Sequence, residues 1–129
     1  MNFTMEDIER IKASCDYIEM IKQLKRIGVL ACNYDVTTGV FTYYGDNKHV
    51  LTEPSNGLQL TPEIEVNPDA VQNAVEKITQ GLINYEDFCH EVALAGVFSW
   101  EVNLELLHIE YKNKEGQVLM RELIPSFAD

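Results

Sequence analysis

Residues 84–103, NYEDFCHEVALAGVFSWEVN, hold the two patterns that decide the fold. The first part is typical of an amphipathic helix: Asn84 and Asp87 predict an N-terminal cap, and apolar residues then recur at helical spacing. Gly96 predicts the end of this helix, because glycine readily adopts the left-handed conformation found just after a helix. From Phe98 onward apolar and polar residues alternate, which is typical of a strand whose sheet has one face in water. The segment therefore favours an α+β domain.

Similar signals extend over the rest of the second half. Asn67 followed by Pro68 predicts the start of a helix that ends before Gly81. Further strands are expected at residues 106–112 and 117–124. The expected architecture is a two-layer domain of helices on an antiparallel sheet.

The first half shows the same kinds of element. A capping box at Thr4 and Asp7 opens a helical region ending before Gly28, which fits two short helices with a kink near residues 14–16 better than one straight helix. Strands are then expected in the region 29–52, with a turn at Thr37-Thr38-Gly39. Residues 58–66 fit either a strand extension or a loop.

The two halves share a layout of two helices followed by about three strands. An offset of 68 residues aligns Tyr17 with Tyr85, Gly28 with Gly96, Tyr43 with Tyr111 and Leu51 with Leu119. We expect a single domain over residues 1–129, with 4–66 and 67–125 as the halves of an internal duplication. The alternative is that any helix followed by glycine and a strand looks like this.

The charge is strongly negative, with 21 acidic residues against 10 basic ones and a formal net charge of −11. The imbalance is concentrated between residues 49 and 110, which carry eleven acids and one base, Lys77. Half of the basic residues lie instead between Arg10 and Arg26. Because phosphate backbones and anionic membranes are bound by lysine and arginine, direct binding to nucleic acid or to a membrane is disfavoured.

The three cysteines Cys15, Cys32 and Cys89 are too few and too scattered for a disulfide framework. Each falls on an apolar face of a predicted helix or strand, where free cysteine usually acts as a small buried hydrophobe. The first residues have neither a basic nor an apolar signal region, and the longest apolar run, residues 92–98, is too short to span a bilayer. Together these features predict a cytoplasmic location.

A family resemblance lies mainly in the second half. The run AGVFSW at residues 95–100, followed by Asn103, Tyr111 and ELIP at residues 122–125, resembles the YdfO/YbcV-like family of small bacterial and prophage-borne proteins, often labelled "phage envelope protein". The first half is similar in its tyrosine-bearing helix and strands, so the resemblance covers most of the chain. It implies a two-layer α+β fold without an established activity, and it carries over no catalytic or binding residue.

Motifs that would indicate chemistry are missing from the sequence. The glycine-rich phosphate motifs, GxSxG and HExxH do not occur. The histidines His49, His90 and His108 do not have metal-ligand spacing, and Cys89 and His90 would point about 100° apart on a helix. We therefore predict no catalytic, cofactor-binding or metal-ligating residues and no cofactor.

Other chemistry-bearing side chains have simpler structural explanations. The acids Glu86, Asp87 and Glu91 lie early in a helix, where they favour the helix dipole. Trp100 is expected to be a core anchor. Tyr43 and Tyr44 should point to opposite faces of their strand, which would leave at least one of them exposed as a modest sign of an interface.

The leading hypothesis is a non-catalytic protein-interaction or binding protein, associated with prophages and of unknown partner. A sharper variant is that the acidic segment 49–110 mimics nucleic acid towards a basic host protein; the alternative is that the acids serve solubility. The rival hypothesis is a small-ligand-binding protein or enzyme with a cleft between the two halves. Edge strands of a six-strand sheet could also pair between chains to give a homodimer.

Overall fold

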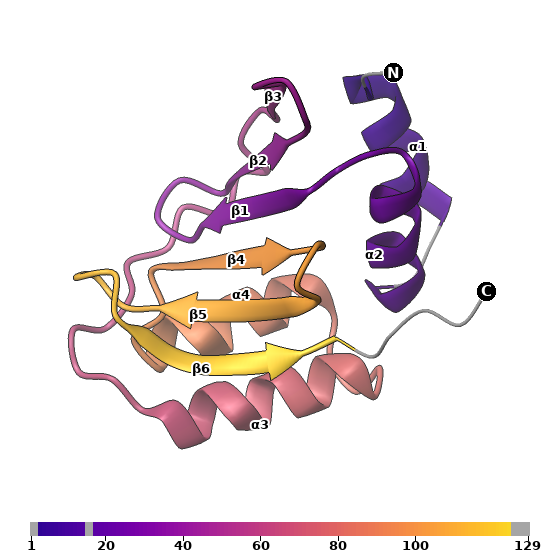
Figure 1. The fold of residues 1–129 in the computed structure, drawn as a ribbon. Coiled ribbons are helices and arrows are strands. Elements are labelled where there is room, and N and C mark those ends of the chain that lie inside the picture. Colours follow the sequence, from indigo (N-terminus) through magenta and orange to yellow (C-terminus); the bar gives the residue numbers. More distant parts are fainter. Residues whose placement is uncertain (1–2, 15–16, 125–129) are drawn as a thin grey trace.

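The computed structural model describes residues 3–14 and 17–124, which form four helices and six strands (Figure 1). In chain order the elements are α1 (Met5–Ser14), α2 (Tyr17–Arg26), β1 (Ala31–Asp35), β2 (Val40–Tyr44), β3 (Val50–Thr52), α3 (Pro68–Thr79), α4 (Tyr85–Leu94), β4 (Ser99–Asn103), β5 (His108–Lys112) and β6 (Val118–Leu123). The α+β prediction is confirmed.

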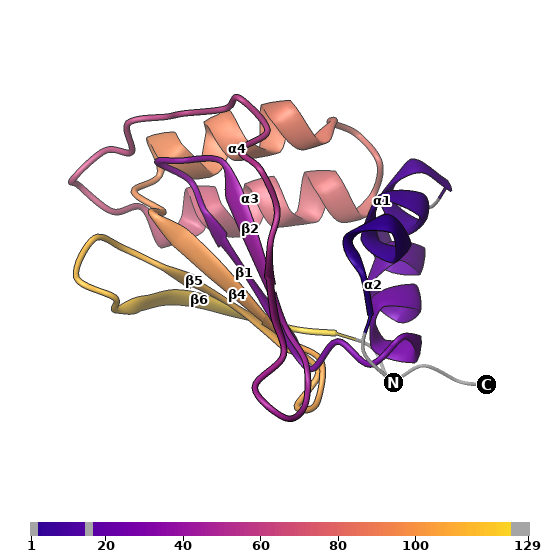
Figure 2. The ribbon, with the colours of Figure 1, turned by 90° about the horizontal axis from the view of Figure 1, so that it is seen from above.

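The six strands form one antiparallel sheet in the order β3-β2-β1-β4-β5-β6. The first strand of each half is therefore central, and the third strand of each half is an edge. Figure 2 shows the helices as two neighbouring pairs, α1–α2 and α3–α4, on one side of the sheet. None of the four described helices covers the other face, as the alternation in the sequence predicted.

Side chains on the helix side of the sheet form the core. Two rows cross the strands there: Leu51, Tyr43, Cys32, Val102, Ile109 and Glu122 in one, and Phe41, Tyr34, Trp100, Tyr111 and Met120 in the other. Trp100 is only 3% exposed, as expected of a core anchor. Tyr43 is buried whereas Tyr44 is 39% exposed, which confirms that the two tyrosines face opposite ways.

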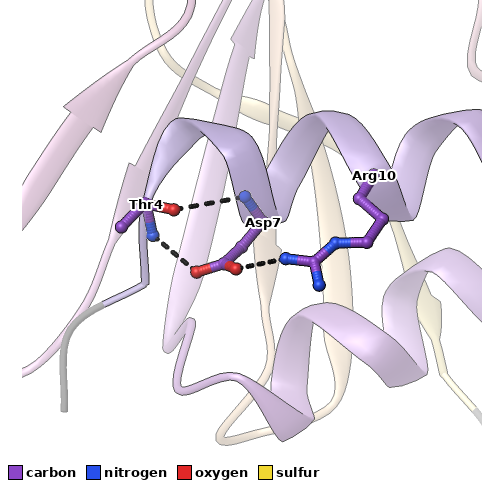
Figure 3. Close-up of polar contacts among 3 residues, drawn as sticks. All are labelled: Thr4, Asp7 and Arg10. Carbon is purple, nitrogen blue, oxygen red and sulfur yellow. Dashed lines mark hydrogen bonds and ion pairs between the residues drawn. The ribbon is translucent and has the colours of Figure 1, made fainter.

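The helix starts follow the capping signals in the sequence. The backbone N–H of Thr4 donates to Asp7 Oδ2 at 2.9 Å, and that of Asp7 donates to Thr4 Oγ1 at 3.2 Å (Figure 3). The hydrogen bond from the Thr4 backbone is the main cause that lowers the pKa of Asp7, and Arg10 assists. Asn67 and Asn84 cap α3 and α4 through their side-chain oxygens, which accept from the backbone N–H of Ala70 and of Asp87.

The structure bears on the predictions for the N-terminal helices and for residues 58–66. The prediction of two short helices at the N-terminus is confirmed, but the core of the expected kink, Cys15 and Asp16, lies outside the described residues. Residues 58–66 form a loop without a strand. This loop runs along α4, where the N–H of Glu63 donates to the carbonyl of Ala93 at 2.9 Å.

The junctions between helix and strand have the same geometry in both halves. Gly28 and Gly96, the residues aligned by the offset of 68, have φ of 99° and 94°. In each half the residue after the glycine donates back to the helix, from Val29 N to Leu24 O and from Val97 N to Val92 O. The central strands β1 and β4 also pair symmetrically, because Asn33 lies opposite Glu101, the residue 68 positions later.

Candidate functional site

A small cavity lies where the two halves meet, between the α1–α2 pair and the covered side of the sheet. Its volume is about 20 Å³, room for about one water molecule. The lining residues come from both halves: Lys12, Met20, Ile21, Leu24, Cys32, Phe41 and Tyr43 from the first, and Tyr85, Trp100 and Val102 from the second. Most of this wall is aromatic or aliphatic, so chemistry here would depend on a few polar atoms.

Three polar side chains beside the cavity, Lys12, Glu53 and Tyr43, are linked by hydrogen bonds. Lys12 Nζ lies 2.7 Å from Glu53 Oε2, and the hydroxyl of Tyr43 donates to Glu53 Oε1 at 2.6 Å. The Lys12 ammonium also lies 4.7 Å from the centre of the Phe41 ring. Burial and then the Glu53 carboxylate raise the pKa of Tyr43 far above its usual range, so Tyr43 stays protonated as a donor. Each carboxylate oxygen of Glu53 thus has a partner, which favours a structural role.

The two described thiols are unsuited to nucleophilic chemistry. Cys32 lines the cavity, and burial raises its pKa to about 12. Cys89 lies 3.9 Å from the hydroxyl of Tyr34, and burial raises its pKa to about 11. Since the thiolate is the reactive form, neither thiol is activated near neutral pH. Cys15 lies outside the described residues.

The three histidines are placed on separate elements. His49 lies in the turn before β3, with Nε2 2.8 Å from the carbonyl oxygen of Phe3. His90 is exposed on α4, and His108 lies on β5 on the open side of the sheet. In the described ranges, residues 3–14 and 17–124, no group of three or more His, Cys, Asp or Glu side chains could hold a metal ion.

Six exposed acidic residues lie on α3, on α4 and in the loop before α3. We call this surface the acidic helical face, defined by the exposed residues Glu63, Glu65, Asp69, Glu76, Glu86 and Asp87. Glu86 and Asp87 lie in the first turn of α4 as predicted. The same prediction was wrong for Glu91, which lies past the first turn and forms an ion pair with Lys77 at 3.0 Å. Three large apolar side chains are 68–76% exposed nearby in the chain: Ile64 in the same loop, Leu82 between α3 and α4, and Leu94 at the end of α4.

A groove crosses one end of this face, between the loop and the C-terminal end of α4. It is an open hollow of about 440 Å³ lined by Glu63, Glu65, Val66, Asn67 and Leu94. Backbone hydrogen bonds fix its walls, from Glu63 N to Ala93 O and from Asn67 N to Ala95 O, both 2.9 Å long. The sequence signalled only the local excess of acids, because nothing in residues 58–66 predicted that the loop would lie along α4.

The open face of the sheet is different in character. Its central row reads Thr52, Thr42, Asn33, Glu101, Glu110 and Arg121 across the strands. Arg121 pairs with Glu110, and this hydrogen bond is the main cause that lowers the pKa of Glu110. Acids and bases are therefore mixed on this face, and it offers no charge preference comparable to that of the acidic helical face.

Comparison with known proteins identifies the family of this chain. Within the part of the chain that the structure describes, no helix has the length and apolar character needed to cross a membrane. No curated protein matches the chain. The model of a family described as "Protein of unknown function (DUF1398)" matches residues 6–123, which is most of the chain. The chain belongs to the DUF1398 family, whose function is unknown.

Proposed function

We propose that this protein is a non-catalytic interaction protein that binds a basic protein through its acidic helical face. The observation that carries the proposal is that α3, α4 and the loops next to them carry six exposed acids and three exposed large apolar side chains. Acids alone would serve solubility. Acids next to exposed aliphatic side chains are what a docking surface for a basic partner needs.

The rest of the molecule supports this choice by contrast. The thiols Cys32 and Cys89 have raised pKa values, and the Glu53 carboxylate is bonded to Lys12 and Tyr43. These three groups are thus unsuited to covalent or acid–base chemistry. A negative surface attracts a positive partner at long range and speeds their encounter, and it repels nucleic acid and anionic membranes.

Affinity capture from cells that encode the protein tests the proposal. The full chain is used as bait in about 50 mM and about 300 mM salt, because exposed charge pairs weaken as ionic strength rises. We expect a reproducible partner with a basic surface, retained at low salt and largely lost at high salt. A monomeric protein that captures nothing reproducibly, or a partner whose binding ignores salt, would contradict the proposal.

A second candidate is a small-ligand-binding protein with its site between the two halves. The specific observation in its favour is the cavity lined by Cys32 and Tyr43 from one half and by Tyr85 and Trp100 from the other. At about 20 Å³ the cavity must widen before any metabolite fits. Native mass spectrometry of protein purified from its own cells tests this candidate: a co-purifying small molecule supports it, and the bare chain mass argues against it.

We also propose that the two halves, residues 4–66 and 67–125, arose by internal duplication. Three observations support the duplication: the order of elements is the same in both halves, Gly28 and Gly96 form matching junctions, and Asn33 pairs with Glu101, the residue 68 positions later. The groove lies at the boundary of the halves, since Glu63, Glu65 and Val66 end the first half whereas Asn67 and Leu94 belong to the second. Expression of residues 67–125 alone, with folding followed by circular dichroism, tests whether one half is a folding unit.

We also propose a narrower family membership and a cytoplasmic location for the protein. The run at residues 95–100 supports membership of the YdfO/YbcV-like, "phage envelope protein"-like group and an association with prophages. The free, buried thiols of Cys32 and Cys89 support a cytoplasmic site of action. Gene neighbourhoods rich in phage genes and a cytosolic fraction in cell fractionation are the expected results.

A further inference from the structure

We infer that the groove between residues 63–67 and the end of α4 binds a basic segment of a partner protein that carries one apolar anchor side chain. The inference rests on the proposed function and names its site and the chemistry of its occupant. Three features carry it: exposed apolar side chains that line the groove, carboxylates that form no ion pair with the residues the structure describes, and walls held in place by backbone contacts.

Two of the side chains that line the groove are apolar and exposed to water. Leu94 is 69% exposed at the last position of α4, and Val66 is 42% exposed in the facing loop. Ile64, 76% exposed, extends this apolar surface along the loop. An aliphatic or aromatic side chain of a partner would remove this surface from water, which is the main source of binding energy in such contacts.

The rim supplies the charge preference. Glu63 and Glu65 line the groove on its loop side, and Asp69 follows in the first turn of α3. Among the described residues none forms an ion pair with these three carboxylates, and the nearby base Lys77 is paired with Glu91. Lysine or arginine residues on both sides of the anchor would therefore meet carboxylates that have no competing cation.

The walls are fixed before a partner arrives. The loop is tied to the end of α4 by the two backbone hydrogen bonds at Ala93 and Ala95. Gly96 lets it approach closely, because a Cβ there would lie 2.8 Å from the carbonyl oxygen of Glu65. A preformed groove loses little conformational freedom on binding, which favours affinity for a short segment.

The occupant is a different protein rather than this chain itself. The chain's own bases are concentrated on α1 and α2, where Lys12 is bonded to Glu53 and Lys25 donates to the carbonyl of Leu104 at 2.8 Å. Those side chains are already used within the fold. A second copy of the chain would also bring its own net charge of −11 against an acidic surface.

A peptide titration tests the inference. The probe is an acetylated, amidated peptide of sequence KRKLKRK, added to the full 15N-labelled chain and followed through its backbone amide signals. We expect saturable shifts centred on residues 63–67 and 93–96 that weaken as salt is added. A peptide with alanine in place of leucine should bind about 10-fold more weakly, from loss of one buried side chain. Shifts centred elsewhere, or none, overturn the inference, as do dimer signals from the chain alone.

Matched variants separate the groove from the rest of the face. Leu94→Ser should weaken peptide binding about 10-fold, whereas Leu82→Ser, at a position of equal exposure outside the groove, should change it less than about 2-fold. Glu63→Gln with Glu65→Gln should weaken binding about 3- to 10-fold at low salt, against no change for Glu105→Gln with Glu115→Gln. Equal effects of target and control variants would overturn the inference.

The same variants test the groove inference separately from the proposed function. If Leu94→Ser still captures the partner that the wild-type chain captures from cells, the groove inference fails and the proposed function stands. If the wild-type chain captures no partner at all, the proposed function fails whatever the peptide does. Retained unfolding midpoints for all variants show that lost binding is not lost folding.

Discussion

Replacing Gly96 by alanine is the perturbation whose effect the structure defines best. Gly96 has φ of 94°, in the left-handed region, and it lies where the end of α4 meets the loop before α3. A Cβ at this position would lie 2.8 Å from Glu65 O and 3.0 Å from Val66 Cα. Both atoms belong to backbone, so the clash cannot be relieved by a change of rotamer.

The expected loss of stability has two parts. Placing an L side chain in the left-handed region costs about 1–2 kcal/mol. Forcing a methyl group against packed backbone adds about 1–3 kcal/mol. Gly81→Ala is the matched control, because Gly81 has φ of 72° and nothing within 4 Å of its Cβ position, so only the first part applies.

Urea unfolding of the two variants and the wild type measures both parts. We expect Gly96→Ala to lower the free energy of unfolding by about 2–5 kcal/mol and Gly81→Ala by about 1–2 kcal/mol. In thermal melts each kcal/mol corresponds to about 3–5 °C for a domain of this size. Equal losses in the two variants would refute the close approach of the loop to α4, and with it the shape of the groove.

Three further perturbations test other parts of the structure. Glu53→Gln should lower the free energy of unfolding by about 1–3 kcal/mol because it leaves the Lys12 ammonium without its carboxylate, and the added change Lys12→Met should restore part of the loss; additive effects in this double-mutant cycle would contradict the pair. Thr4→Ala should cost about 1 kcal/mol through loss of the capping box, and no loss in a urea melt would contradict that cap. Cys32 and Cys89 should resist iodoacetamide at pH 8 until the chain is unfolded, as measured by peptide mass spectrometry. Because their pKa values are raised in the folded state, the unfolded state loses its protons first, so stability should fall as pH rises above about 9, and a rise in stability there would contradict their burial.

The local signals in the sequence were sufficient to predict the helices and strands. Asn84, Gly96 and the alternation around Trp100 act on neighbouring backbone groups, and each has the predicted effect in the structure. The same holds for the capping box at Thr4. Caps, left-handed glycines and strand alternation depend on residues a few positions apart, which is why one sequence suffices to predict them.

The candidate site could not be predicted, because it depends on contacts between distant segments. The bond between Lys12 and Glu53 joins residues 41 positions apart, and nothing in either segment marks the other as its partner. The groove likewise needs residues 63–67 to lie against the end of α4. The sequence of that loop fitted a strand as well as a loop, so its position emerged only from the packing.

Hydrogen–deuterium exchange on the complex with the captured partner tests the central claim most directly. Amides are compared between the free chain and the complex, segment by segment. We expect slower exchange on binding in residues 58–69 and 85–96, which hold the groove and five of the six acids of the acidic helical face, with the sheet unchanged. Protection confined to β2, β3, β5 or β6 would contradict it, since the partner would then bind the open face of the sheet.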